Sequence, residues 1–137
     1  MTTERIQNTT RHLYEGVHHP IDMPLSASLQ FKDPLVIVSG RTRVLRMFRR
    51  LNALFPASTL KTFVPIEGQS EQFQLCTHYR RTPQSPPHVF ETIMELKVVD
   101  GEITAITEHW KSPITLHGNS TNPAARFFRR GLGRLLS

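Results

Sequence analysis

The hydrophobic pattern of this chain changes its period once, at Pro56, and this change limits the folds that the chain can adopt. Before Pro56, the range 41–55 carries apolar residues at spacings of three and four, which is the period of an amphipathic helix. After Pro56, apolar and polar residues alternate, which is the period of half-buried strands. Helices followed by consecutive strands predict an α+β domain.

Two helices are predicted ahead of the strands. The first covers 3–14, although the pair Thr9-Thr10 lowers its helix propensity. The second covers 41–55, between Ser39-Gly40 and Pro56, which are typical of helix boundaries. Between the two helices, the range 25–31 fits either a strand or a helical turn.

Four strands are predicted after the second helix. They cover the ranges 59–66, 71–81, 89–99 and 102–116. Asp100-Gly101, between the last two, is typical of a two-residue hairpin turn, which pairs Val99 with Glu102 and Val98 with Ile103. Continued along both strands, this pairing assigns every side chain to one of two faces.

The more apolar of these two faces is expected to meet the helices. It holds Phe90, Thr92, Met94, Leu96, Val98, Ile103, Ala105, Thr107 and His109. The other face holds Glu91, Ile93, Glu95, Lys97, Val99, Glu102, Thr104, Ile106, Glu108 and Trp110. Apolar residues interrupt the charges of this second face, a pattern that suits a contact in a homodimer.

Composition excludes several classes of protein. The chain has 137 residues, enough for one domain, and 38% hydrophobic residues, enough for one core. A single cysteine, Cys76, excludes an intrachain disulfide framework. The longest aliphatic run, 35–38, is too short to cross a bilayer, and the first residues lack the apolar core of a signal peptide. We therefore expect an intracellular, cytoplasmic protein.

Two short segments resemble a known family. They are Phe31-x-Asp33-Pro34, followed by Gly40 and an amphipathic helix, and Asp100-Gly101-Glu102-Ile103, followed by Glu108-His109-Trp110. Over about residues 5–116 the chain resembles nuclear-transport-factor-2-like domains, which include SnoaL-like, or polyketide-cyclase-like, proteins. The resemblance implies a cone, in which a curved antiparallel sheet wraps the N-terminal helices around an apolar cavity, often in a homodimer. The family commonly has Asp after this Trp, where the chain has Lys111, so no catalytic Asp is carried over to that position.

Three residues are candidates for acid–base chemistry in such a cavity. The resemblance implies that Asp33 lies near the mouth of the cavity, where apolar walls would raise its pKa; alternatively, Asp33 caps the turn before Pro34. His109 is expected to face the helices and to carry a proton, oriented by Asp33, unless it is a structural core histidine. The hydroxyl of Tyr79 would polarise a substrate oxygen, unless Tyr79 is a core residue.

The remaining predictions concern the pocket and its surroundings. The pocket is expected to be lined by Tyr14, Phe31, Phe48, Thr77, Phe90, Met94, Leu96 and Thr107. We expect no cofactor and no metal, because His18, His19 and Asp22 fit no standard metal site. A solvated or dimer-facing charge ladder is predicted for His78, Arg80, Glu91, Glu95 and Glu108.

The C-terminal range 121–137 differs from the domain predicted over 1–120. Nine of the 17 lysines and arginines lie in 41–50 and 126–134, and the net charge is +6. We predict a basic amphipathic helix that either docks on its own domain or binds an anionic membrane. Its contact residues would be Arg126, Phe127, Phe128, Arg129, Arg130 and Arg134. Nucleic acid is not expected, because no recognisable nucleic-acid-binding module is present.

Two functions are favoured on the sequence alone, ahead of a nucleic-acid or scaffold partner. The first is a cofactor-independent isomerase, dehydratase or cyclase that acts on a small apolar molecule, with Asp33 and His109 as acid and base. The second is a non-catalytic domain that binds lipid or protein and is recruited to anionic membrane by its C-terminal helix.

Overall fold

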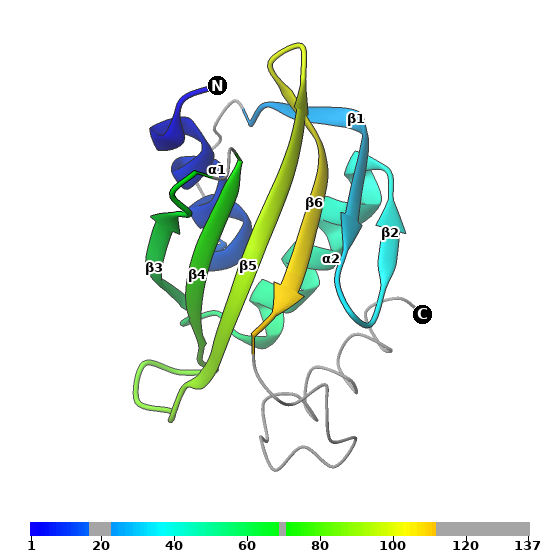
Figure 1. Ribbon diagram of the computed structural model, residues 1–137. Helices are drawn as coiled ribbons and strands as arrows, with labels where there is room; N and C mark the ends of the chain where they lie inside the picture. The colour runs from blue at the N-terminus through cyan, green and yellow to red at the C-terminus, as the bar shows by residue number, and fades with distance from the viewer. Residues whose placement is uncertain (17–22, 69–70, 112–137) are drawn as a thin grey trace.

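The computed structural model describes residues 1–16, 23–68 and 71–111, which form two helices against a curved, open six-stranded sheet (Figure 1). The helices are α1 (Thr3–Glu15) and α2 (Arg41–Leu54). The strands are β1 (Leu25–Lys32), β2 (Ile37–Ser39), β3 (Thr59–Pro65), β4 (Gln72–Tyr79), β5 (His88–Val99) and β6 (Glu102–Trp110). The α+β prediction is confirmed, and the range 25–31 belongs to a strand.

The sheet is mixed, whereas the sequence predicts an antiparallel one. Its strands lie in the order β2-β1-β6-β5-β4-β3. All neighbours are antiparallel except β1 and β6, which run parallel. The parallel pair arises because α2 and four strands separate β1 from β6 in the chain, so the two meet through a long crossover instead of a hairpin.

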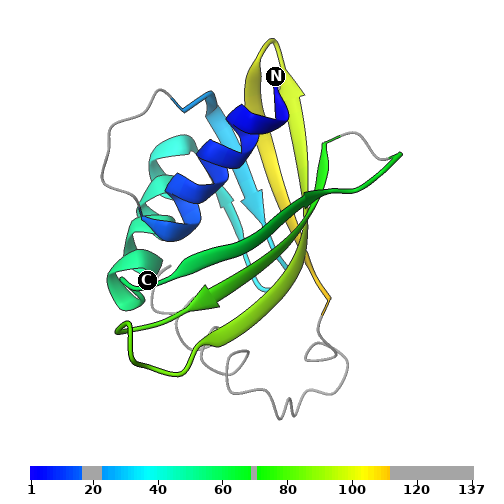
Figure 2. The ribbon, with the colours of Figure 1, turned by 90° about the vertical axis from the view of Figure 1, so that its left-hand side faces the viewer.

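Both helices lie inside the curve of the sheet (Figure 2). α1 is capped at its N-terminus by Thr2, whose hydroxyl accepts a hydrogen bond from the Arg5 N–H at 3.2 Å, and at its C-terminus by Gly16, whose φ is +66°. The hydroxyls of Thr9 and Thr10 donate to carbonyls one turn earlier, at 2.9 and 2.8 Å. These bonds satisfy both buried hydroxyls, so the two threonines are accommodated within the helix.

The core lies between the helices and the concave face of the sheet. α2 contributes Val44, Met47, Phe48 and Leu51, and it leaves its arginines exposed. The inner faces of β4 and β5 carry Phe73, Leu75, Thr77, Tyr79, Phe90, Thr92, Met94 and Leu96, all buried. For these two strands the predicted alternation is confirmed.

An extra residue in β6, Thr104, changes the sheet beyond the last hairpin. Val98 lies opposite Ile103, as predicted, but Lys97 lies opposite Ala105, so Thr104 has no partner in the ladder. A bulge of one residue exchanges the inner and outer positions for the rest of the strand. The predicted faces of β6 are therefore wrong from residue 105 onward.

Several predictions fall on residues that the structure does not describe. They are the end of the last strand at 112–116, the C-terminal helix of 121–137 with its six contact residues, and His18, His19 and Asp22. The membrane-binding and homodimer predictions stay predictions. In the described ranges, no helix is long and apolar enough to span a bilayer.

Candidate active site

The bulge at Thr104 directs Glu108 into the space between the sheet and the helices. Glu108 is only 8% exposed, and Ile106 beside it is buried. His109 lies on the outer face, with 55% of its side chain exposed. The prediction that His109 faces the helices is therefore wrong, and so is the placement of Glu108 in a solvated charge ladder.

Two aromatic side chains hold the Glu108 carboxyl. The Tyr14 hydroxyl, from α1, donates a hydrogen bond to Oε2, and the Trp110 indole N–H donates to Oε1 at 3.3 Å. Burial raises the pKa of Glu108 to about 7, and the charge of Asp33 adds to the rise, while the bonds from Tyr14 and Trp110 oppose it. Near neutral pH this carboxyl therefore exchanges readily between its protonated and ionised forms.

Asp33 follows β1 and is buried at the same site. Its Oδ1 accepts hydrogen bonds from the backbone N–H groups of Leu35 and Val36, both at 2.8 Å. Burial raises the pKa of Asp33, and these two bonds lower it because they stabilise the ionised form. Asp33 therefore caps the turn, which is one of the two roles considered for it in the sequence analysis. It also lines a hollow between the helices and the sheet.

Tyr14 and Tyr79 are phenols that stay protonated. Burial raises the pKa of each well above the usual value, and the nearby charge of Glu108 raises both further. Each hydroxyl is therefore a hydrogen-bond donor at the site.

A hollow lies where α1, α2 and the ends of β4 and β6 meet. It is lined by Tyr14, Phe31, Asp33, Met47, Phe48, Leu51, Tyr79, Phe90, Glu108 and Trp110. Its volume is about 350 Å³ when its opening to solvent is included. The part that a bound molecule could occupy without moving the lining side chains is only about 20 Å³. That space accommodates roughly one water molecule, so a larger ligand must displace lining side chains.

The hollow brings together most of the residues proposed from the sequence. Of these, Tyr14, Phe31, Asp33, Phe48, Tyr79 and Phe90 lie on its wall. Thr77, Met94 and Leu96 are buried in the sheet but do not line the hollow. Thr107 does not line it either, because the bulge turns this residue to the outer face. The chemical roles of Asp33 and Tyr79 stay predictions.

Glu108, Trp110, Met47 and Leu51 line the hollow and were not in the predicted site. A signal for the first two exists in the sequence. After Ile103, the next large apolar residues are Ile106 and Trp110, which lie on the face opposite to Ile103 in strict alternation. A three-residue step from Ile103 to Ile106 indicates a bulge, because an extra residue is needed to bury both.

On the outer face, His109 belongs to a separate polar network. Its Nε2 lies 3.1 Å from Glu95 Oε2, and the Gln72 amide donates to Glu95 Oε1 at 2.6 Å. The network spans β4, β5 and β6 on the side of the sheet away from the helices. His109 is therefore not placed to exchange protons with Asp33.

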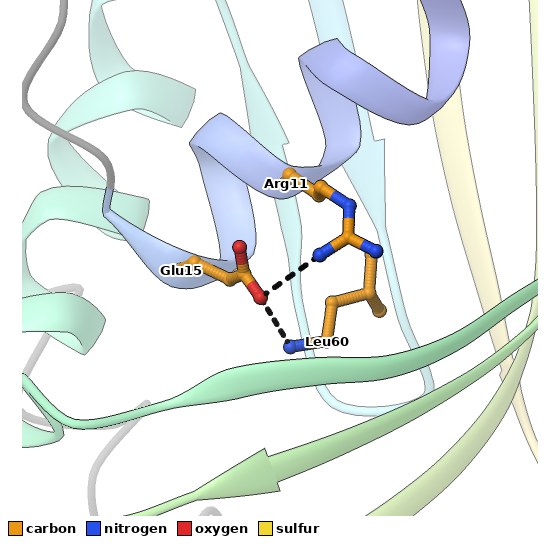
Figure 3. A network of polar contacts seen from close by, with 3 residues as sticks. All are labelled: Arg11, Glu15 and Leu60. Atoms are coloured by element: carbon orange, nitrogen blue, oxygen red, sulfur yellow. Dashed lines mark hydrogen bonds and ion pairs between the residues drawn. The ribbon is translucent and has the colours of Figure 1, made fainter. Parts of the chain in front are cut away.

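The C-terminal end of α1, which carries Tyr14, is hydrogen-bonded to β3 at the edge of the sheet (Figure 3). The Glu15 carboxylate accepts a hydrogen bond from the backbone N–H of Leu60 at 2.8 Å, and Arg11 lies 3.4 Å from the same oxygen. On the other side, the Asn52 amide of α2 donates to the Leu13 carbonyl at 3.0 Å. These contacts fix the helical turn that presents Tyr14 to Glu108.

We expect Glu15→Ala to lower the free energy of unfolding by about 1–3 kcal/mol, because the buried N–H of Leu60 loses its acceptor. Glu15→Gln keeps an acceptor oxygen and should lose clearly less. Urea denaturation of both variants measures the difference, and hydrogen exchange at the Leu60 amide localises it. Equal losses in the two variants would contradict the assigned contact.

Within the described ranges, no three His, Cys, Asp or Glu side chains come together as a metal site would require. The chemistry available to the hollow is that of two carboxyls with raised pKa and two phenolic hydroxyls.

Comparison of the whole structure with known ones shows the fold of NTF2-like proteins. An NTF2-like protein from Anabaena variabilis matches with a TM-score of 0.62 at 13% identity, over 80% of this chain and 85% of that one. A protein described as a polyketide cyclase from Xanthomonas campestris matches with a TM-score of 0.59 at 16% identity, over 80% and 89%.

A third similar structure has a ketosteroid isomerase-like fold and comes from Catenulispora acidiphila; it was solved in complex with trimethylamine. Its TM-score is 0.57 at 16% identity, over 91% of this chain and 98% of that one. No family model matches the sequence, and no curated protein sequence matches it either. At these identities the likeness establishes the fold and leaves the chemistry to the residues of the hollow.

Proposed function

We propose that this protein is a cofactor-independent acid–base enzyme that moves a proton on a small organic molecule containing a carbonyl group. The observation that carries the proposal is the Glu108 carboxyl, which is buried among aromatic rings and has a pKa of about 7. The negative charge of Asp33 contributes to this raised pKa. Two neighbouring carboxyls can act as acid and base at the same pH when one environment favours the protonated form and the other the ionised form. Structures of similar fold described as a polyketide cyclase and as ketosteroid isomerase-like support this class of reaction.

The two carboxyls take different roles in the proposed reaction. Two backbone N–H groups stabilise the ionised form of Asp33, so Asp33 is the base that removes a proton from the carbon beside the carbonyl. Protonated Glu108 donates to the carbonyl oxygen, where charge develops, and Tyr79 is a second donor. Asp33 then returns its proton to carbon and Glu108 recovers its own, so both carboxyls end as they began.

The hollow must widen for this reaction, because its accessible space is about 20 Å³. Trp110 is the lining residue best placed to move, since it is the last residue of β6 and is only partly buried. The substrate would replace the indole as a neighbour of Glu108.

The direct test is deuterium incorporation from heavy water into a panel of small enolisable ketones, followed by NMR. We expect exchange by the wild-type protein and a loss of about a hundredfold or more in Glu108→Gln and in Asp33→Asn. His109→Ala changes only the outer face and should keep the wild-type rate. A rate that falls in His109→Ala and survives in Glu108→Gln would overturn the assignment.

The pH dependence of the exchange rate should follow the protonation state of Glu108. Because the acid must be protonated, the rate should fall as the pH rises through about 7, the pKa of Glu108. The rate should also fall at low pH, where Asp33 becomes protonated. A rate that keeps rising well above neutral pH would show that Glu108 does not act as the acid.

A further inference from the structure

The wall of the hollow is unbalanced in charge. Its ten lining residues include six aromatic side chains, which are Tyr14, Phe31, Phe48, Tyr79, Phe90 and Trp110. They also include two carboxyls, Asp33 and Glu108, and no lysine, arginine or histidine among the residues that the structure describes. Every described group on this wall that can carry a full charge near neutral pH carries a negative one.

We propose that the molecule bound in this hollow is an amine in its cationic form, with an alkylated ammonium group seated among the aromatic rings and the two carboxyls. The inference rests on the proposed function, because it uses the same hollow and the same carboxyls. It adds the charge of the substrate: the reacting carbonyl compound carries an ammonium group close to the carbonyl.

The aromatic rings favour a cation for a geometrical reason. Phe31 meets Phe48 at 82°, and Phe90 meets Trp110 at 87°, so in each pair the positive edge of one ring points at the negative face of the other. The methyl groups of an alkylated ammonium also carry positive charge and are attracted to ring faces. A ligand that displaces Trp110 can therefore place its ammonium group against the aromatic rings that line the hollow.

The carboxyls favour a cation for an electrostatic reason. Glu108 and Asp33 repel each other when both are ionised. An ammonium group in the hollow is attracted to ionised Asp33 while Glu108 stays protonated as the acid, and to both carboxylates once Glu108 ionises. An anionic ligand would meet both carboxyls, and the described part of the wall offers no compensating positive group.

Within residues 1–16, 23–68 and 71–111, no other element facing Glu108 on this wall brings a positive charge. α1 contributes Tyr14, β4 contributes Tyr79, and the turn after β1 contributes Asp33. α2 faces the hollow with Met47, Phe48 and Leu51, while its arginines are exposed. Binding of a cation should therefore tighten as the pH rises and Glu108 becomes ionised.

The test compares two ketones of the same shape. Acetonyltrimethylammonium carries a quaternary nitrogen where methyl neopentyl ketone has a carbon, so the two differ in charge and hardly in size. Trp110 is the only tryptophan of the chain, so its fluorescence reports binding at the site itself. We expect the cation to bind about tenfold more tightly than the neutral ketone at pH values near 8.

Two variants that remove one negative charge each show where the preference originates. Glu108→Gln acts within the hollow and should remove most of the preference for the cation. Glu95→Gln acts on the outer face and should leave the preference unchanged, because Glu95 does not line the hollow. Equal affinity for the two ketones, tighter binding of the neutral one, or no binding of the cation at millimolar concentration would each overturn the inference.

Deuterium exchange into the same two ketones separates this inference from the proposed function. Exchange into the neutral ketone with no preference for the cation would leave the enzyme proposal standing and overturn the amine. Preferential binding of the cation without exchange into either ketone would support the amine and contradict the enzyme.

Discussion

The Glu108→Gln variant is expected to become more stable relative to the wild-type protein as the pH rises from about 4 to about 8. In the folded wild-type protein the pKa of Glu108 is about 7, against 4.5 for an ordinary glutamate. Ionising this carboxyl where it is buried therefore costs free energy that the unfolded chain does not pay. Glutamine has a similar shape and no proton to lose, so the variant avoids this cost.

The sign follows from the direction of the pKa shift. A carboxyl whose pKa is raised by folding contributes its full stability below the unfolded value of 4.5, and the contribution is lost as the pH rises through about 7. A shift of this size corresponds to roughly 3 kcal/mol. The difference in the free energy of unfolding between variant and wild type should therefore change by about that amount in favour of glutamine.

Urea denaturation of both proteins at a series of pH values measures this difference. Glu95→Gln is the matched control, because it removes the same charge from the exposed outer face, where the expected effect on stability is below about 1 kcal/mol. A difference between Glu108→Gln and wild type that stays constant over the whole pH range would mean that Glu108 is not desolvated.

Insertion of one alanine between Thr104 and Ala105 is expected to destabilise the fold strongly. If the bulge keeps its size of one residue, the added residue turns Ile106 outward and His109 inward. Exposing Ile106 alone costs about 1.5–3 kcal/mol, and a buried histidine without a partner adds about 1–3 kcal/mol. Together these losses reach the lower end of the stability of a typical domain, about 5–15 kcal/mol.

Thr104→Ala keeps the residue count and is the control for this insertion. It removes only the hydroxyl that donates to the Lys97 carbonyl at 3.2 Å, which contributes about 0.5–1.5 kcal/mol. Circular dichroism and urea denaturation should show a folded Thr104→Ala protein and a strongly destabilised insertion variant. If the insertion variant folds with nearly wild-type stability, the number of residues before Ile106 does not set which face of β6 is buried.

Most elements of the fold were predictable because their signals are local. The helical period in 41–55 depends on residues three and four apart, and the alternation in β4 depends on residues two apart. The Asp100-Gly101 turn is equally local, since both residues adopt the positive φ that the hairpin requires. The parallel pairing of β1 with β6 was not predicted, because it joins segments that are distant in the chain.

The same distinction between local and long-range signals applies to the candidate site. The position of Asp33 before Pro34 and the aromatic residues of the inner faces follow from short patterns, and the structure places them on the wall of the hollow. The sequence predicts His109 in the site beside Asp33, whereas the structure places its neighbour Glu108 on the wall of the hollow and His109 on the outer face. A single bulge reverses a face, so an error of one residue exchanges a buried group for an exposed one.

Local patterns in the sequence are sufficient to predict the two helices, the last four strands, the hairpin turn and an inner face rich in aromatic residues, because each depends on neighbouring residues. Which side of β6 faces inward depends on packing between distant segments. β1 pairs with β6 on one side and is irregular at the same level, between Leu25 and Gln30, while β5 pairs on the other. The position of the bulge is set by packing Ile106 and Trp110 against elements from the rest of the chain, and this packing places a carboxyl with a pKa near 7 beside Asp33.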